Sequence, residues 1–179
     1  MLTFLRLRKI NSPKIRIAVY DSFTCSPRVL TCRGKTIKAA IEDFSQRIYH
    51  LAQKRGGKLP FSVIKELVEN LLHAKFTDVT VTIFPEGNII RFSDRGPGIS
   101  DPKKAFQPGF SSASQAEKKH IKGVGSGLPV AKEALKSLGG KIEIEKNLDG
   151  GTVITISSGE VEAAASNEEI SPDEEAGKS

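Results

Sequence analysis

The sequence predicts an α+β protein, a two-layer α/β sandwich in which a mixed, mostly antiparallel sheet carries helices on one face. Segments with apolar residues at alternate positions, typical of strands, occur between segments with apolar residues at helical spacing. Turns rich in Gly, Pro and Asn separate these segments. The 179 residues, 38% hydrophobic and 27% charged, are typical of a globular domain with a core of its own.

Strand and helix patterns follow one another in the first half of the chain. The N-terminus, MLTFLRLRKI, alternates apolar and basic residues and indicates a strand rather than a signal peptide. KIRIAVYDS alternates in the same way. Residues 36–54 carry apolar side chains at helical spacing, and Gly56-Gly57 ends this predicted helix. A second helix is predicted over residues 62–74, with Pro60 just before it and Ser62 as its N-cap.

The second half contains two hairpins with a loop and a helix between them. Strands are predicted over residues 78–84 and 88–94, joined by a Pro-Glu-Gly turn. A loop rich in Ser, Lys and Gly follows, from Ser100 to Gly127. It leads into a helix over residues 128–138, closed by two glycines. The final hairpin pairs residues 141–145 with residues 152–157.

Charge is distributed unevenly along the chain. Residues 1–60 contain 13 Lys and Arg against 3 Asp and Glu, a net +10, whereas residues 159–179 contain 1 against 7, a net −6. We therefore distinguish an N-terminal strand and helix segment (1–60), integral to or preceding the core, a core (61–158) and an acidic disordered tail (159–179). The basic segment leaves nucleic-acid binding possible, but a solvated surface partly neutralised by the tail is the favoured interpretation.

Membrane and metal signals are weak. No run of about 18 apolar residues occurs, so we expect no membrane span, and a cytoplasmic location follows as the expectation. Cys25 and Cys32 have no His nearby and are expected to be reduced, partly buried thiols on a strand-loop segment rather than a zinc site.

The first candidate for chemistry is a polar stripe on the helix predicted over residues 62–74. At 100° per residue, Glu66, Asn70 and His73 share one side of this helix. The opposite arc is apolar and consists of Ile64, Leu67, Val68 and Leu71. An Asn oxygen can ligate a hard cation such as Mg²⁺, and a Glu can orient or deprotonate a nucleophile. A solvent-facing stripe is the alternative for this helix taken alone.

Two glycine-rich segments are the other candidates. Asp94 ends a strand, where its carboxylate could accept a hydrogen bond from an exocyclic amine, and Gly96 and Gly98 would let a flat base approach the backbone. Taken alone, this segment is also an ordinary turn. KGVGSGLPV places three glycines and a lysine before a helix, as in an anion site, although it matches neither a P-loop nor a Rossmann fingerprint.

These patterns, in this order, resemble the Bergerat-fold ATP-binding superfamily of gyrase B, heat-shock chaperones, histidine kinases and MutL. The resemblance covers residues 60–158. KELVENLLHA is similar to the N box of the superfamily, DRGPGI to its first glycine box, and GVGSGLPVAKEALKSLGG to its second.

The resemblance implies ATP and Mg²⁺ as cofactors and a role for each matching residue. Glu66 would be the general base and Asn70 the Mg²⁺ ligand. Asp94 would bind the adenine amino group, with Thr152 nearby through a water. His73 replaces an Asp of MutL-like members, so its role beside the nucleotide stays open. The base pocket would include Gly96, Gly98 and Ile99. The phosphates would lie against Lys122, Gly123, Val124, Gly125, Ser126, Gly127 and Leu128.

The arrangement of a strand, one helix and the N-box helix resembles the stand-alone anti-sigma serine kinases, and FQPGFSSAS (106–114) resembles their approach to the ATP lid. This implies transfer of the γ-phosphate to a regulatory partner protein, with a homodimer possible and no membrane involved. His50 is expected to be a helix-surface residue rather than a phosphoacceptor. The alternatives are an ATP-hydrolysing conformational switch that takes a phosphate-sensing Lys from another subunit, and a nucleotide-sensing module without turnover.

Overall fold

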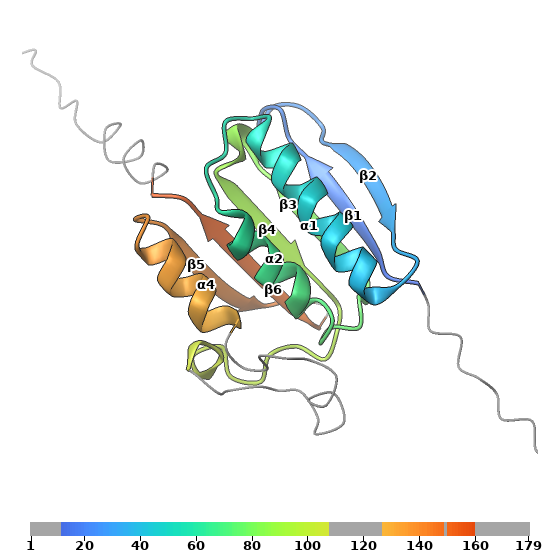
Figure 1. Ribbon diagram of the computed structural model, residues 1–179, viewed down its shortest axis with the longest axis vertical. Coiled ribbons are helices and arrows are strands. Elements are labelled where there is room, and N and C mark those ends of the chain that lie inside the picture. The colour runs from blue at the N-terminus through green and yellow to red at the C-terminus, as the bar shows by residue number, and fades with distance from the viewer. Residues whose placement is uncertain (1–11, 108–126, 149, 160–179) are drawn as a thin grey trace, which may run out of the picture.

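The chain folds into one sheet covered on one face by helices (Figure 1). The structure, a computed structural model, describes residues 12–107, 127–148 and 150–159. The strands lie in the order β2-β1-β3-β4-β6-β5. β1 and β3 are parallel, and the other neighbouring pairs are antiparallel. The predicted α+β sandwich with a mixed, mostly antiparallel sheet is confirmed.

With the exception of β2, the strands occur where alternation predicts them. Their bounds are β1 Lys14–Val19, β2 Arg28–Arg33, β3 Val79–Ile83, β4 Ile89–Ser93, β5 Lys141–Lys146 and β6 Thr152–Ser157. β2 lies in the segment expected to combine strand and loop. The strand predicted at residues 1–10, most of the lid loop and the acidic tail from residue 160 lie outside the described residues.

The helices are α1 (Ile37–Gln53), α2 (Phe61–Asn70) and α4 (Gly127–Lys136). Pro60, not Ser62, is the N-cap of α2, so the predicted N-cap is wrong. Pro60 is extended (φ −65°, ψ 142°) and its carbonyl accepts the N–H of Ile64 at 3.3 Å. Because proline has φ fixed and no N–H to lose, the helix can begin directly after it. α2 also ends four residues before the predicted 74.

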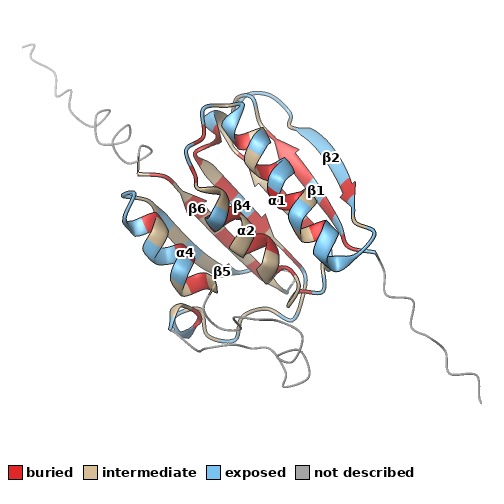
Figure 2. Ribbon diagram, viewed as in Figure 1, coloured by how far each residue is buried: buried red, intermediate tan, exposed pale blue. Residues whose placement is uncertain are grey.

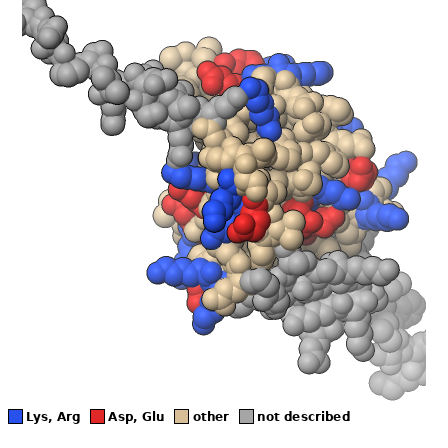
Figure 3. Space-filling view, turned by 60° about the vertical axis from the view of Figure 1, so that its left-hand side comes forward, with Lys and Arg blue, Asp and Glu red and all other residues tan. Residues whose placement is uncertain are grey.

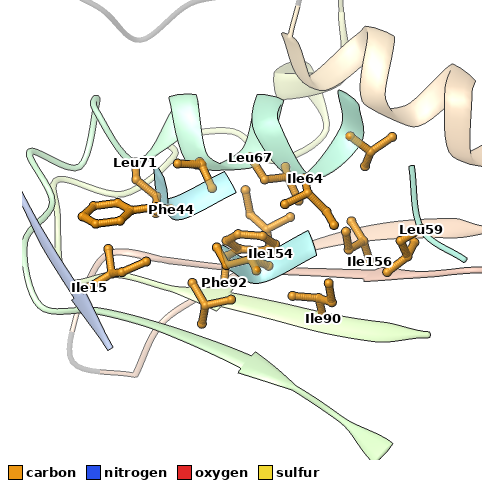
Figure 4. Close-up of a cluster of buried hydrophobic side chains, with 14 of the residues drawn as sticks. Ile15, Phe44, Leu59, Ile64, Leu67, Leu71, Ile90, Phe92, Ile154 and Ile156 are labelled. Atoms are coloured by element: carbon orange, nitrogen blue, oxygen red, sulfur yellow. The ribbon is translucent and has the colours of Figure 1, made fainter. Parts of the chain in front are cut away.

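The core lies between the sheet and the helices (Figure 4). Phe44 of α1 is completely buried and meets Phe76 edge to face, with ring centroids 6.1 Å apart. The arc of α2 predicted to be apolar is buried, with no side chain more than 4% exposed: Ile64, Leu67, Val68 and Leu71. Figure 2 shows the buried residues concentrated where helices and sheet face each other. Sheet and core continue across residue 60, since β1 pairs with β3 and α1 packs on α2.

Short turns set the ends of these elements. Pro85–Gly87 joins β3 to β4 as a one-turn helix, η1, and confirms the predicted hairpin. A second short helix, η2 (Lys104–Phe106), begins the long loop.

Within the described ranges, no helix is long and apolar enough to cross a membrane.

Candidate functional site

The candidate site lies at the end of β4, where the chain leaves the sheet at Asp94. Asp94 is only 8% exposed, and its Oδ1 accepts a hydrogen bond from the backbone N–H of Gly96 at 2.8 Å. The backbone N–H of Asp94 donates to the carbonyl of Thr152 at 3.0 Å, so the two predicted adenine-side residues are neighbours. Burial raises the pKa of Asp94, and hydrogen bonds from the amides of Gly96 and Thr152 oppose this shift.

The β5–β6 hairpin holds the backbone of Asp94 in place. Asn147 donates through Nδ2 to the carbonyl of Asp94 at 2.9 Å and to Oγ of Ser93 at 3.0 Å. Gly151 has φ +94°, and a Cβ added there would lie 2.1 Å from the carbonyl oxygen of Asp94. Asn147 was not predicted as a site residue, because an Asn shortly before a Gly-Gly turn is typical of any hairpin loop.

Close contacts within the chain leave no room for a side chain at either glycine of the predicted base pocket. A Cβ on Gly96 would lie 2.6 Å from Cα of Ala74, so this turn sits directly on the segment after α2. Gly98 has φ +78°, and a Cβ there would be 3.2 Å from the carbonyl oxygen of Gly151. Close packing within the chain therefore requires these glycines, in addition to any clearance they give to a base.

Asn70 ends α2 and has an unsatisfied amide. Its Nδ2 is buried and has no hydrogen-bond partner, a state shared among the described side chains only with Oγ of Ser158. Leaving a buried polar group unpaired costs about 1–3 kcal/mol. A ligand that brings an acceptor oxygen next to Asn70 would remove this cost.

Glu66, one turn before Asn70, faces the start of α4. A Cβ on Gly127 would lie 2.5 Å from Oε2 of Glu66, so the carboxylate lies against the first residue of α4. Burial raises the pKa of Glu66, as does neighbouring Glu69, whereas Lys65 lowers it. The structure thus brings together one predicted residue from the N box and one from the second glycine box.

The remaining predicted residues divide into three groups. Leu128 packs into the core from α4, and Ile99 lies partly buried against the same core. His73 is half-buried in the turn after α2, where its backbone N–H donates to the carbonyl of Asn70 at 3.0 Å. Five predicted phosphate-site residues lie outside the described residues: Lys122, Gly123, Val124, Gly125 and Ser126.

The first residues of the predicted lid approach contact α4. Nζ of Lys132 lies 4.6 Å from the centroid of the Phe106 ring, and Ala105 beside it is buried. The remainder of FQPGFSSAS, from residue 108, lies outside the described residues.

The two cysteines are free thiols in different surroundings. Cys25 is exposed in the β1–β2 loop and Cys32 is buried on β2, so the expectation that both are partly buried is wrong. The difference follows from the fold, because only Cys32 faces the helix layer, paired with Ile15. Burial raises the pKa of the Cys32 thiol.

Comparison with known proteins identifies the family. Residues 57–160 match the family described as histidine kinase-, DNA gyrase B-, and HSP90-like ATPase. The C4-dicarboxylate transport sensor protein DctB of Pseudomonas aeruginosa is 33% identical over 72 residues, which are 39% of this chain but 11% of DctB. This chain therefore spans a small part of that relative's length.

One solved structure shares the fold, and a second gives a weaker superposition. The DIP2311 protein from Corynebacterium diphtheriae superimposes with a TM-score of 0.67 at 13% identity, over 83% of this chain and 34% of that one. The catalytic domain of histidine kinase ThkA gives a TM-score of 0.43 at 19% identity, over 65% of this chain and 90% of that domain. The family match covers more than half of the chain and coincides with the region that resembles Bergerat-fold proteins. This chain therefore belongs to the histidine kinase-, DNA gyrase B- and HSP90-like ATPase family.

Proposed function

We propose that this chain binds ATP with Mg²⁺ at the end of β4 and acts as a regulatory protein kinase of the anti-sigma serine kinase type. The supporting observation is the buried carboxylate of Asp94 at the sheet end, next to the segment that follows Asn70. A buried carboxylate that already accepts hydrogen bonds from two backbone amides can also accept one from an amino group of a purine.

The residues around Asp94 fit a nucleotide and its metal. The buried Nδ2 of Asn70 lacks an acceptor that a phosphate oxygen would provide, and an Asn side-chain oxygen is a ligand type that Mg²⁺ accepts. Mg²⁺, when bound, supplies positive charge against the phosphates. The backbone at the start of α4 adds the positive end of a helix dipole on the same side.

Glu66 is the proposed general base. Its carboxylate accepts the proton of the partner's hydroxyl as that oxygen bonds to the γ-phosphorus and the bond to ADP breaks. Burial raises the pKa of Glu66, which makes the carboxylate a stronger base than an exposed one. The proposed setting is the cytoplasm, with a regulatory protein as phosphoacceptor and a homodimer as the assembly.

Incubation with γ-labelled ATP and Mg²⁺, with and without a lysate of the host, tests this proposal. Label on a lysate protein supports the kinase. Release of free phosphate alone would indicate an ATP-driven switch, and bound but unconverted ATP would indicate a nucleotide sensor.

Matched variants of α2 sharpen the test. Glu66→Gln is expected to lower transfer about 10²–10⁴-fold, because general-base catalysis contributes about that much, while ATP still binds. Glu69→Gln removes a neighbouring carboxylate of the same helix, which lies 3.9 Å from Lys65 and only modulates the pKa of Glu66. It is expected to change transfer far less than Glu66→Gln does. Equal transfer by wild type and Glu66→Gln would show that Glu66 is not the base.

A further inference from the structure

Among the described residues, β2 forms one edge of the sheet, and its central residues are uncharged. Figures 1 and 2 show this strand at the margin of the sheet with a largely exposed surface. Val29 is 58% and Leu30 45% exposed, on opposite faces of the strand. The strand at the other edge, β5, contains Glu143 and Glu145. On the side of the molecule formed by α4 and β5, basic and acidic side chains are intermixed (Figure 3). Charges along an edge oppose pairing with another strand, and β2 lacks them at its centre.

The backbone groups of β2 that point outward follow from its pairing with β1. The N–H of Gly34 donates to the carbonyl of Pro13 at 2.8 Å. Hydrogen-bonded and non-bonded pairs alternate in an antiparallel ladder. Every second pair counted inward from this one is therefore hydrogen-bonded. The backbone N–H and C=O groups of Cys32 and Leu30 belong to such pairs and point toward β1. The N–H and C=O of Val29, Thr31 and Arg33 therefore point away from the sheet.

The charges at this edge select the strand that can pair with it. Lys14 and Arg33 lie directly opposite each other and on the same face, since they flank the buried Ile15–Cys32 pair. Like charges in this position repel each other. A second copy that paired β2 with β2 in antiparallel register would align the residues with outward backbone groups, Val29 with the partner's Arg33. It would bring no carboxylate to this repulsion, since β2 contains none. A strand with carboxylates on this face would offset it.

We propose that β2 is the docking edge for an extended, acidic segment of a partner protein, which adds a strand beside β2. Its backbone pairs with the outward groups of Val29, Thr31 and Arg33. Its carboxylates lie over Lys14 and Arg33, and its alternate apolar side chains contact Leu30 on the helix side. This surface is separate from the ATP site, so the proposal stands or falls independently of the proposed function.

A labelled peptide tests this docking edge in the full chain. The probe is a fluorescein-tagged peptide of Glu-Val repeats, measured by fluorescence anisotropy at low ionic strength, with a Lys-Val peptide of equal length as the control. The Glu-Val peptide is expected to bind at least about tenfold more tightly, because its charge opposes that of the edge. No saturable binding, or equal binding of the two peptides, would overturn the proposal.

Thr31→Pro tests the backbone pairing itself. This substitution removes one outward N–H but none of the ladder to β1, and an edge strand tolerates proline there. It is expected to weaken peptide binding about tenfold or more, as the loss of a shared hydrogen bond predicts. Thr31→Val keeps the N–H and should bind as wild type does. Binding that survives Thr31→Pro unchanged would contradict strand addition.

Amide hydrogen exchange of the wild-type chain gives a measurement that needs no variant. In the free protein, the amides of Leu30 and Cys32 are expected to exchange slowly and those of Val29, Thr31 and Arg33 quickly. The Glu-Val peptide should slow the second group. Protection that instead appears at high protein concentration without peptide would identify a second copy as the occupant and overturn the proposal.

Discussion

Replacement of Gly151 by Ala tests the close contact that holds Asp94. Gly150 and Gly151 have nearly the same backbone angle, φ +90° and +94°. A Cβ on Gly150 would meet nothing within 4 Å, whereas on Gly151 it would lie 2.1 Å from the carbonyl oxygen of Asp94. Gly150→Ala is therefore a matched control that carries the backbone cost without the collision.

The expected magnitudes follow from this difference. Positive φ costs a residue with a Cβ about 1–2 kcal/mol at either position. The entropy lost from the unfolded chain is the same for both variants and cancels in the comparison. Overpacking adds about 1–3 kcal/mol at Gly151 alone. The carbonyl of Asp94 cannot move away without breaking its hydrogen bond to Nδ2 of Asn147. Gly151→Ala should thus be the less stable variant by about 1–3 kcal/mol.

Urea unfolding of both variants at one pH measures the difference, with the denaturant slope compared to confirm a two-state transition. Titration with ATP should show weaker binding by Gly151→Ala only, because the displaced backbone carries Asp94 with it. If the two variants unfold at the same urea concentration, the proposed contact between Gly151 and Asp94 does not constrain the fold.

The other predictions concern the core and the candidate site. Phe44→Ala should lower the free energy of unfolding by about 3–5 kcal/mol in urea titrations, whereas Phe23→Ala, at a side chain 75% exposed, should change it little. Burial raises the pKa of Asp94 in the folded protein. The free energy of unfolding is therefore highest below the pKa that Asp94 has in the unfolded chain, and it falls as the pH rises through the pKa that Asp94 has in the folded protein. Asp94→Asn should then unfold at higher urea than wild type at neutral pH but not in acid, while ATP binding falls; equal pH profiles would contradict this. Asn147→Asp removes the donor to the Asp94 carbonyl and should lower the free energy of unfolding by about 1–3 kcal/mol. It should also weaken ATP binding, which calorimetry can measure. Unchanged ATP affinity would show that Asn147 does not position Asp94.

Local periodicity predicted most of the elements. The alternation of KIRIAVYDS and the helical spacing of residues 36–54 correspond to β1 and α1, because each has one face against the core. β2 was predicted less clearly, since only Cys32 of this edge strand is buried and its sequence shows little alternation. The end of α2 was overestimated because residues after Asn70 continue its apolar pattern while forming turns.

The sequence predicted several residues of the candidate site but not the contacts between them. The stripe of Glu66 and Asn70 follows from helix geometry alone. The contact between Glu66 and Gly127 does not, because it depends on how α4 packs beside α2. Asn147 gave no signal at all, since its role depends on the pairing of β4 with β6.

The sequence by itself determined which segments become strands and helices and which residue types stand at the ends of β4 and α2, because burial of one face imposes a local period on the residues. The tertiary structure decided the strand order and the neighbours of each polar group. It placed Asn147 against Asp94, Gly127 against Glu66 and Lys14 beside Arg33. Such contacts join segments far apart in the chain, and they arise only when the two layers pack and the strands align in register.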